Sequence, residues 1–474
     1  MSRAIALLLA ALELGLASCA TRVPRALTPQ IVPKTFIPQS AESTPLWPRV
    51  GWWQGFESAE LTQLIKAARE NNRDLAAAAA RVMEAQAQTL IARSALFPQS
   101  SLQAQAQRAK SGSSSVATTG FPGTGNAFGL DATASYELDL WGHARANLRA
   151  AQETLKATRF AQEAAALSIT AGVADGYFSI LALRERIAIA NEDITAINGI
   201  LGVIKLRVST GTSSHLDLAR EQAQVESAQA QLPVLEEQEL EARLALALLL
   251  GRPPEAFEVR AQNADGIHLP SVSPGIPSQL LLRRPDVAEA EANLASAHAN
   301  LDAARAAFLP QFALTGSAGF TSTAVGALLH GPSFLWDAGA NLVQAIFDGS
   351  LFWQKNLAYA TQNELIASYQ GAVLNAYADV ESALGQVNDA AKAEGHLQRE
   401  VSAAREAFAI AQLQYRQGAA DLLTVLQAQQ TLFGARDQLA QTQLARMQAV
   451  VHLYEALGGG WVERSKDRTQ EEAR

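Results

Sequence analysis

The chain has 474 residues, of which 48% are hydrophobic and 18% charged, enough for a large core or for several domains. Its net charge of −8 and the absence of a basic patch in the sequence argue against a nucleic-acid-binding protein. The chain contains a single cysteine, Cys19, which excludes an internal disulfide.

The first residues predict a lipoprotein signal peptide over residues 1–18. Arg3 supplies a positive charge, and the apolar run 4–16 is too short to span a bilayer as a mature helix. The following "LASC" resembles the lipobox of bacterial lipoproteins, in which the cysteine, here Cys19, is lipidated and becomes the first mature residue. The alternative is an initial helix with a chance cysteine. No later run is long and apolar enough for a transmembrane helix, so a membrane-spanning form must be a closed β-barrel.

Prolines follow the signal peptide at short intervals. Six of them lie between residues 24 and 48, where they prevent a regular helix. We therefore expect an extended N-terminal arm over residues 19–60. The polar residues 461–474 predict a frayed C-terminal tail.

The body of the chain is an internal duplication. Residues 72–99 match 284–311 at an offset of 212 positions, and further along the offset is 207. The change places about five extra residues in the Ser/Gly/Thr-rich stretch 110–126, since a hairpin loop accepts an insertion at little cost. We expect two structural repeats, residues 61–260 and 261–460. The glycine pairs at the offset of 207 are Gly142 and Gly349, Gly211 and Gly418, and Gly251 and Gly458.

Each repeat is predicted to contain a helix, a β-hairpin and a long helical hairpin. We expect the β-hairpins at 97–141 and 309–348, and the helical hairpins at 143–250 and 350–458. Apolar residues in the long helices alternate spacings of three and four, the pattern of antiparallel coiled coils. The proline-free run 143–208 corresponds to about 100 Å of helix. Pro233 is expected to kink the helix in which it lies.

Residues 128–140 alternate apolar with small or polar side chains, which predicts a strand with two different faces. Asp131, Glu137 and Asp139 lie on its polar face. Four strands cannot close a membrane barrel, and lipid does not tolerate open edges, whereas three copies would supply twelve strands. The three acids would then face the lumen and attract cations. The alternatives are a solvated strand face and a soluble sheet whose apolar face packs on the helices.

Several segments, taken in this order, resemble the outer-membrane factors of tripartite efflux systems. The similarity is to TolC-like proteins, and especially to their lipoprotein branch, the OprM and NodT group. The resemblance covers nearly the whole mature chain. The segments are "YELDLWG" (136–142), "LALLLGRPP" (246–254), "LLLRRPDVAEAEANL" (280–294), "FLPQF" (308–312) and "LYEALGGGW" (453–461).

The resemblance implies an α+β membrane protein that forms a homotrimer. A twelve-stranded β-barrel in the outer membrane, with four strands from each chain, would continue into a long α-helical coiled-coil tunnel in the periplasm. The implied function is that of a passive exit duct for small molecules such as drugs and toxic compounds. The implied partners are a periplasmic adaptor (membrane fusion protein), an inner-membrane pump of the resistance-nodulation-division type, and outer-membrane lipid.

The resemblance also implies that the two helical turns, within 206–217 and 414–430, form a periplasmic gate that contacts the adaptor. Asp217 matches a carboxylate of the constriction, and Leu423 matches an apolar gate position. Gln430 stands where an arginine often holds the gate shut, so we expect a weaker electrostatic latch. The alternative reading is ordinary cap glycines and a solvated aspartate. The candidate residues are Gly211, Asp217, Tyr415, Gly418, Asp421, Leu423, Gln427 and Gln430.

The sequence contains no pattern that predicts catalysis. Its histidines are scattered without metal-ligand spacing, and it has no phosphate-binding loop and no nucleophile elbow. We therefore expect neither an enzyme nor a cofactor nor a metal site. The alternative function is a lipid-anchored periplasmic coiled-coil adaptor or scaffold without a pore.

Overall fold

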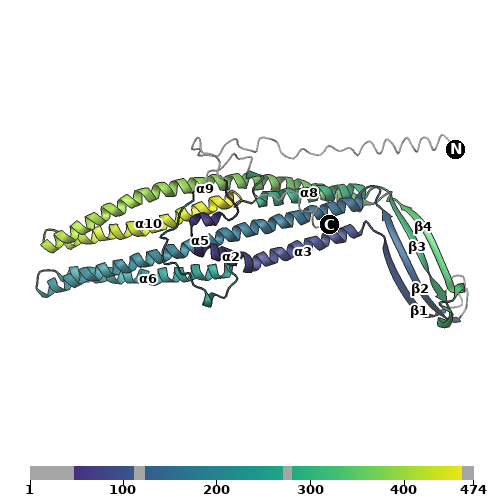
Figure 1. The fold of residues 1–474 in the computed structure, drawn as a ribbon, viewed down its shortest axis with the longest axis horizontal. Helices are drawn as coiled ribbons and strands as arrows, with labels where there is room; N and C mark the ends of the chain where they lie inside the picture. The colour runs from purple at the N-terminus through teal and green to yellow at the C-terminus, as the bar shows by residue number, and fades with distance from the viewer. Residues whose placement is uncertain (1–46, 112–122, 271–279, 462–474) are drawn as a thin grey trace.

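The computed structural model describes residues 47–111, 123–270 and 280–461 of the chain. The predicted signal peptide, Cys19, most of the N-terminal arm and nearly all of the C-terminal tail lie outside the described residues. The described part is elongated, with the turns of two helical hairpins at one end and four strands at the other (Figure 1).

The helices and strands occur in the order that the duplication predicts. The two halves are joined by a segment that contains the short helix η2 (Pro254–Ala256). The first half contains η1 (Trp52–Phe56), α2 (Ala59–Asn71), α3 (Arg73–Ser94), β1 (Gln99–Ser111), β2 (Gly123–Leu138), α5 (His143–Ser209) and α6 (His215–Leu249). The second half contains α8 (Pro285–Ala306), β3 (Gln311–Ser322), η3 (Val325–Ala327), η4 (Gly331–Ser333), β4 (Phe334–Val343), α9 (Gly349–Gln417) and α10 (Leu422–Ala456).

The four strands form one antiparallel sheet in the order β1-β2-β3-β4. The register places Leu102 opposite Ala132, Ala132 opposite Ala318, and Ala318 opposite Trp336. Paired residues point to the same face of a sheet, as do every second residues along a strand. This row, together with every second residue before and after it, therefore defines one face across all four strands. Within the described part of the chain, β1 and β4 each pair on one side only, so both edges of the sheet are open.

The helices are arranged around α5, which packs against α2, α3, α6, α8 and α10. Helix α9 packs against α8 and α10 on the far side, so α3 and α6 lie along one edge of the helical layer and α9 along the other (Figure 1). The largest apolar core includes Trp52 and Tyr454, whose rings stack at 4.9 Å between centroids. We call the part of the molecule around this core the waist. Phe56 contacts Phe178 of α5 in the same core, at 5.0 Å.

Each half is closed at the waist by an equivalent contact between the residue that precedes α3 or α8 and its last helix. Asn72 donates from its side-chain amide to the carbonyl of Leu249 at 2.8 Å, and it also caps α3. At the matching positions of the second half, the Arg284 guanidinium donates to the carbonyl of Ala456 at 3.3 Å. The duplicated sequence therefore repeats a tertiary contact as well as the order of helices and strands.

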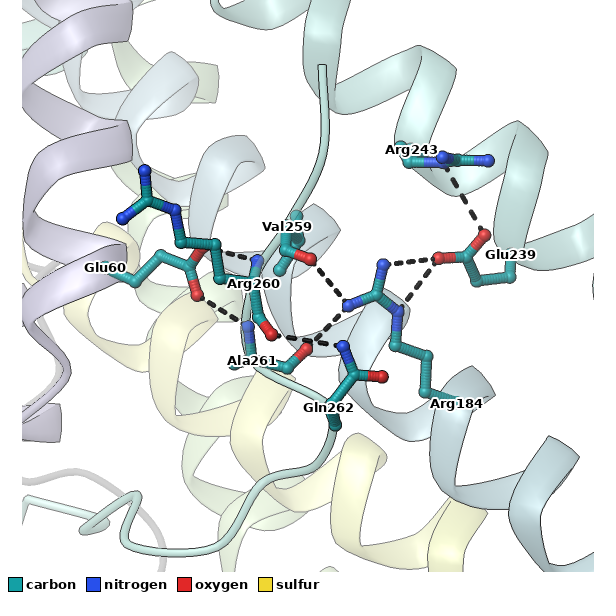
Figure 2. A network of polar contacts seen from close by, with 8 residues as sticks. All are labelled: Glu60, Arg184, Glu239, Arg243, Val259, Arg260, Ala261 and Gln262. Carbon is teal, nitrogen blue, oxygen red and sulfur yellow. Dashed lines mark hydrogen bonds and ion pairs between the residues drawn. The ribbon is translucent and has the colours of Figure 1, made fainter. Parts of the chain in front are cut away.

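The segment that joins the halves is fixed by a polar network (Figure 2). The Glu60 carboxylate accepts hydrogen bonds from the backbone N–H groups of Arg260 and Ala261, at 2.7 and 3.0 Å. Arg184 of α5 donates to the carbonyls of Val259 and Ala261, and it also pairs with Glu239 of α6 at 2.9 Å. The backbone polar groups of this extended segment thus find partners on two helices, α2 and α5.

One expectation about the helices needs revision. Helix α5 contains an 18-residue stretch apolar enough by composition to span a bilayer, so the prediction that no such run exists was wrong. Half of that stretch is buried inside the described chain, as expected for the central helix of the layer. Helix α6 continues through Pro233, and the kink expected there stays a prediction.

The duplicated glycines at the waist give a testable prediction. Gly251 has a φ of +64°, and a Cβ atom there would collide with the carbonyl oxygen of Asn71. We expect Gly251→Ala to destabilise the fold by more than the roughly 1–3 kcal/mol that a strained backbone conformation costs. Gly211→Ala is the matched control, because Gly211 has a φ of +73° but no described heavy atom would lie within 4 Å of the new Cβ. Thermal unfolding followed by circular dichroism should show the larger drop for Gly251→Ala, and equal drops would contradict the packing argument.

Candidate functional site

One face of the sheet is polar and carries acids. Asp131 lies opposite Gln103 and Gly319, and Glu137 lies opposite Ala313 on the same face. The register adds Asp337 of β4 to this face, because it pairs with Ser317, whose hydroxyl donates a hydrogen bond to its carboxylate. The sequence reading missed Asp337, although alternation around it in 334–342 was a usable signal. The polar face therefore presents three acids per chain.

Asp139 is not one of them, which corrects the prediction. It follows the last residue of β2, and its carboxylate accepts hydrogen bonds from the backbone and the guanidinium of Arg145, each at 3.0 Å. Burial alone would raise the pKa of Asp139, but the hydrogen bonds from Arg145 and Ala144 outweigh burial and lower it. Asp139 therefore stabilises the start of α5, next to Gly142, which has a φ of +81°.

The opposite face of the sheet is apolar and uncovered. Trp336 is 70% exposed and Leu102 is 72% exposed, and Phe334, Leu314 and Leu342 on the same face are also exposed. The sheet extends away from the helices in Figure 1, so the described helices do not cover this face. An antiparallel sheet in a soluble domain buries its apolar face against a core. The alternative of a soluble sheet packed on the helices is therefore not what the structure shows.

The first helical turn lies between α5 and α6 and is closed by local hydrogen bonds. Gly211 takes the left-handed conformation that suits a glycine after a helix. Ser214 and Asp217 form a capping box, in which each side chain accepts a hydrogen bond from the other residue's backbone N–H. Hydrogen bonding to Ser214 lowers the pKa of Asp217. Asp217 thus has a structural role at this turn.

The second turn lies between α9 and α10 and has the same design. Gly418 ends α9 with a φ of +76°, and Asp421 caps α10 by accepting hydrogen bonds from the backbone and the hydroxyl of Thr424. These bonds lower the pKa of Asp421. Both predicted glycines therefore work as cap glycines, which is compatible with a place in a gate.

The structure brings the two turns together at one end of the molecule (Figure 1). The Arg207 guanidinium of α5 donates to the carbonyl of Tyr415 at 2.9 Å and lies over the Tyr415 ring, 4.3 Å from its centroid. Next to this contact, Ile204 of α5 packs with Tyr415 of α9 and Val425 of α10 in one apolar cluster. Sequence reasoning missed Arg207, although it expected a latch at this end. The contact between hairpins therefore comes from α5 rather than from position 430.

Three predicted residues lie on the exposed surface of α10 at the same end. Leu423 is 49% exposed, and Gln427 and Gln430 are also exposed. Within the residues that the structure describes, their side chains have no recorded hydrogen bond to the first turn. They are thus available to face a neighbouring copy or a partner.

Ion pairs tie α5 to α10 farther from the turns. Arg186 binds the carboxylate of Asp437 with two hydrogen bonds, at 2.6 and 3.3 Å. Arg436 of α10 binds Glu192 of α5 at 2.6 Å, so in this pair the arginine comes from α10 and the acid from α5. Burial raises the pKa of the neighbouring Asp193 to about 7. The two hairpins are thus joined by these two ion pairs between α5 and α10 and, nearer the turns, by Arg207.

Comparison with known proteins gives consistent matches over nearly the whole chain. The family model described as "Outer membrane efflux protein" matches residues 64–252 and 276–459. The pyoverdine export outer membrane protein OpmQ of Pseudomonas putida is 38% identical, over 95% of this chain and 96% of its own length. The cation efflux system protein CusC of Escherichia coli O6:H1 is 31% identical, over 87% of this chain and 88% of its own length. The solved open state of the outer membrane channel MtrE of Neisseria gonorrhoeae has a TM-score of 0.83 and 29% identity, covering 94% of this chain and all of MtrE.

The Arg207 contact can be tested by truncation. We expect Arg207→Ala to loosen the paired turns by about 1–2 kcal/mol, since it removes a hydrogen bond and a cation–π contact. That loss corresponds to roughly a tenfold shift toward the open arrangement, measured as open probability in planar lipid bilayers. Arg416→Ala is the control, because the Arg416 side chain is exposed and the substitution keeps its backbone carbonyl. Equal behaviour of the two variants would mean that the Arg207 contact does not hold the two turns together.

Proposed function

The chain belongs to the outer membrane efflux protein family, and on that premise we propose that three copies of it close into one trimeric channel. This membership confirms the resemblance read from the sequence, together with the assignment to the outer membrane and to efflux. The protein is an exit duct of an efflux system.

The observation that carries the trimer proposal is the uncovered apolar face of a sheet with two open edges. Lipid can cover the apolar face, but it cannot provide hydrogen-bond partners for the edges. Pairing β4 of one copy with β1 of the next removes every edge, and four strands from each of three copies give twelve. The polar face would then line the lumen, with Asp131, Glu137 and Asp337 from each copy as a cation-attracting surface.

The helical layer supports the same arrangement, because its two lateral edges also carry exposed apolar side chains. On one edge, α3 exposes Met83, Leu90 and Ile91. On the other edge, α9 exposes Trp353 and Leu357. Two different surfaces at opposite edges make a head-to-tail interface, which closes into a ring when the rotation fits.

Partners and cargo follow from the family and from the ends of the rod. We infer that the two turns, with Leu423, Gln427 and Gln430, meet a periplasmic adaptor that is coupled to a resistance-nodulation-division pump. The chain itself would be passive, with energy supplied by the pump. Similar proteins are named for pyoverdine export and for cation efflux, so we assign the choice of cargo to the pump and the adaptor.

The N-terminus would anchor each copy to the membrane. We propose that Cys19 is lipidated, because it follows a short apolar run at a lipobox-like "LASC". The anchor would add to barrel insertion rather than replace it.

Assembly can be tested at the α9 edge. We expect Leu357→Glu to break the oligomer, because it places a charge in an apolar contact between copies. Gln354→Glu, which adds the same charge at an exposed polar position of α9, is the control. The mass of the detergent-solubilised particle from light scattering should be three chains for the wild type and the control, and less for Leu357→Glu. A monomeric wild type would contradict the proposal.

Lipidation can be tested by metabolic labelling. We expect Cys19→Ser to abolish incorporation of labelled palmitate, since the chain contains no other cysteine. The wild type in the same cells is the positive control. Palmitate that persists on Cys19→Ser would overturn the lipobox assignment.

A further inference from the structure

The first helical hairpin carries a fully buried acid in its seam, near the turn. Glu221 of α6 has an exposed fraction of 0%. It lies three residues after Leu218 and four before Val225, so it occupies a seam position of the heptad pattern. Val225 packs with Ile197 of α5 in an apolar cluster to which Leu218 also belongs. The acid therefore interrupts an otherwise apolar seam.

The second hairpin carries a neutral polar residue at the corresponding level. Gln429 of α10 is 1% exposed, and it lies between the buried seam residues Val425 and Leu432. Val425 and Leu432 match Leu218 and Val225 of the first hairpin at the offset of 207. Each hairpin thus has one buried polar side chain between equivalent apolar residues. In each case it lies about two helical turns after the start of the hairpin's second helix, α6 or α10.

Neither polar side chain is satisfied. Both carboxylate oxygens of Glu221, and both the nitrogen and the oxygen of the Gln429 amide, lack a hydrogen-bond partner among the residues that the structure describes. A buried, unpaired carboxylate is costly, whereas the neutral acid costs much less. The burial of Glu221 needs no neighbouring copy, because it is complete within one chain.

Among the described residues, no compensating charge lies beside Glu221. On α5, no charged residue lies between Asp193 and Lys205, and Lys205 is exposed. Arg207, the next charged residue of α5, is engaged with Tyr415.

The other two helices give the same result. On α10, whose Phe433 packs on the same cluster, no charged residue lies between Asp421 and Arg436. On α6 itself, Asp217 is held by Ser214, and Arg220 and Glu226 are exposed.

We propose that Glu221 is the proton-sensitive element of the gate: as a neutral acid it keeps the seam of the first hairpin packed, and its ionisation favours the open arrangement. The proposal rests on the channel function proposed above and specifies how that gate is regulated. In an open arrangement water reaches the seam and solvates the carboxylate. Gln429 is the non-titrating counterpart, which weakens the second seam equally at every pH.

The direction of the effect follows from linkage. Burial raises the pKa of Glu221 to about 7 in the packed arrangement, whereas a water-exposed Glu has a pKa of about 4.3. A raised pKa means that the packed arrangement binds the proton more tightly, so it is favoured at low pH. Its advantage falls as the pH rises from about 4.3 to about 7, and it does not change further above that range. Each pH unit within the range changes the closed-to-open ratio by up to tenfold per chain.

The experiment is a pH series from 5 to 8 on the detergent-purified protein in planar bilayers. We expect the open probability of the wild type to rise at least tenfold over this range. Glu221→Gln keeps the size and polarity of the side chain without its titration, so it should remain closed at all pH values. Glu221→Leu should do the same and close more firmly, and it provides a second variant if one folds poorly.

Two controls separate Glu221 from other titrating groups. Glu226→Gln changes an exposed acid five residues along α6, so it should keep the wild-type pH response. Asp193→Asn removes another acid whose burial raises its pKa to about 7 but which lies beside the ion pairs between α5 and α10 rather than in the seam of the first hairpin, and it should also keep the response. A response lost in Asp193→Asn and kept in Glu221→Gln would overturn the proposal, as would a wild type whose open probability is independent of pH. Failure of the wild type to conduct at any pH would instead contradict the channel function.

Discussion

The sheet imposes the constraint on which the rest of the molecule depends. It has an apolar face that water does not favour and two open edges that lipid does not tolerate. An isolated chain can satisfy one of these requirements but not both. Pairing of the sheet edges between copies in lipid satisfies both. The helices of neighbouring copies must then also pack side by side, so the helical layer needs a contact surface at each of its lateral edges. The exposed apolar stripes on α3 and α9 meet that demand.

The duplication explains how one chain keeps its two long hairpins level. Helices α5 and α9 have 67 and 69 residues, so their ends lie at the same height and the two turns can touch. Both hairpins are fixed in position at the waist. There Gly251 approaches the backbone of Asn71, and Gly458 approaches the backbone of Arg283 at the matching position of the second half. The extra residues between the matching waist and helix positions of the first half lie in its β-hairpin, where β2 has 16 residues and β4 has 10, far from the turns.

Periodicity predicted the elements, and it failed where tertiary contacts decide. The expected helix 143–208 is α5 (His143–Ser209), because a long apolar heptad has no competing interpretation. Asp139 was misplaced because the alternation of β2 continues for two residues beyond the strand, and sequence alone does not show Arg145 returning to bind it.

Asp337 and Arg207 were missed for a related reason. Asp337 joins the polar face through the register of β4 with β3, and Arg207 meets Tyr415 through the contact between two hairpins. Both depend on partners that are distant in sequence. Glu221 was not recognised because the sequence shows its position, four residues before Val225 in the same seam, but does not show that an acid there is buried.

The distribution of buried polar groups along the rod suggests why the turns, and not the waist, would move. The waist has a continuous aromatic and aliphatic core with Trp52, Phe56, Phe178 and Tyr454, which allows one packing arrangement. Near the turns the apolar clusters are smaller, and each hairpin gives up a seam position to a polar residue without a described partner. A polar seam residue preserves register and lowers stability, so the hairpins can separate locally without losing alignment when they close again. A gate at this end therefore needs only a small free-energy difference between its two arrangements, which is within the reach of one proton per chain.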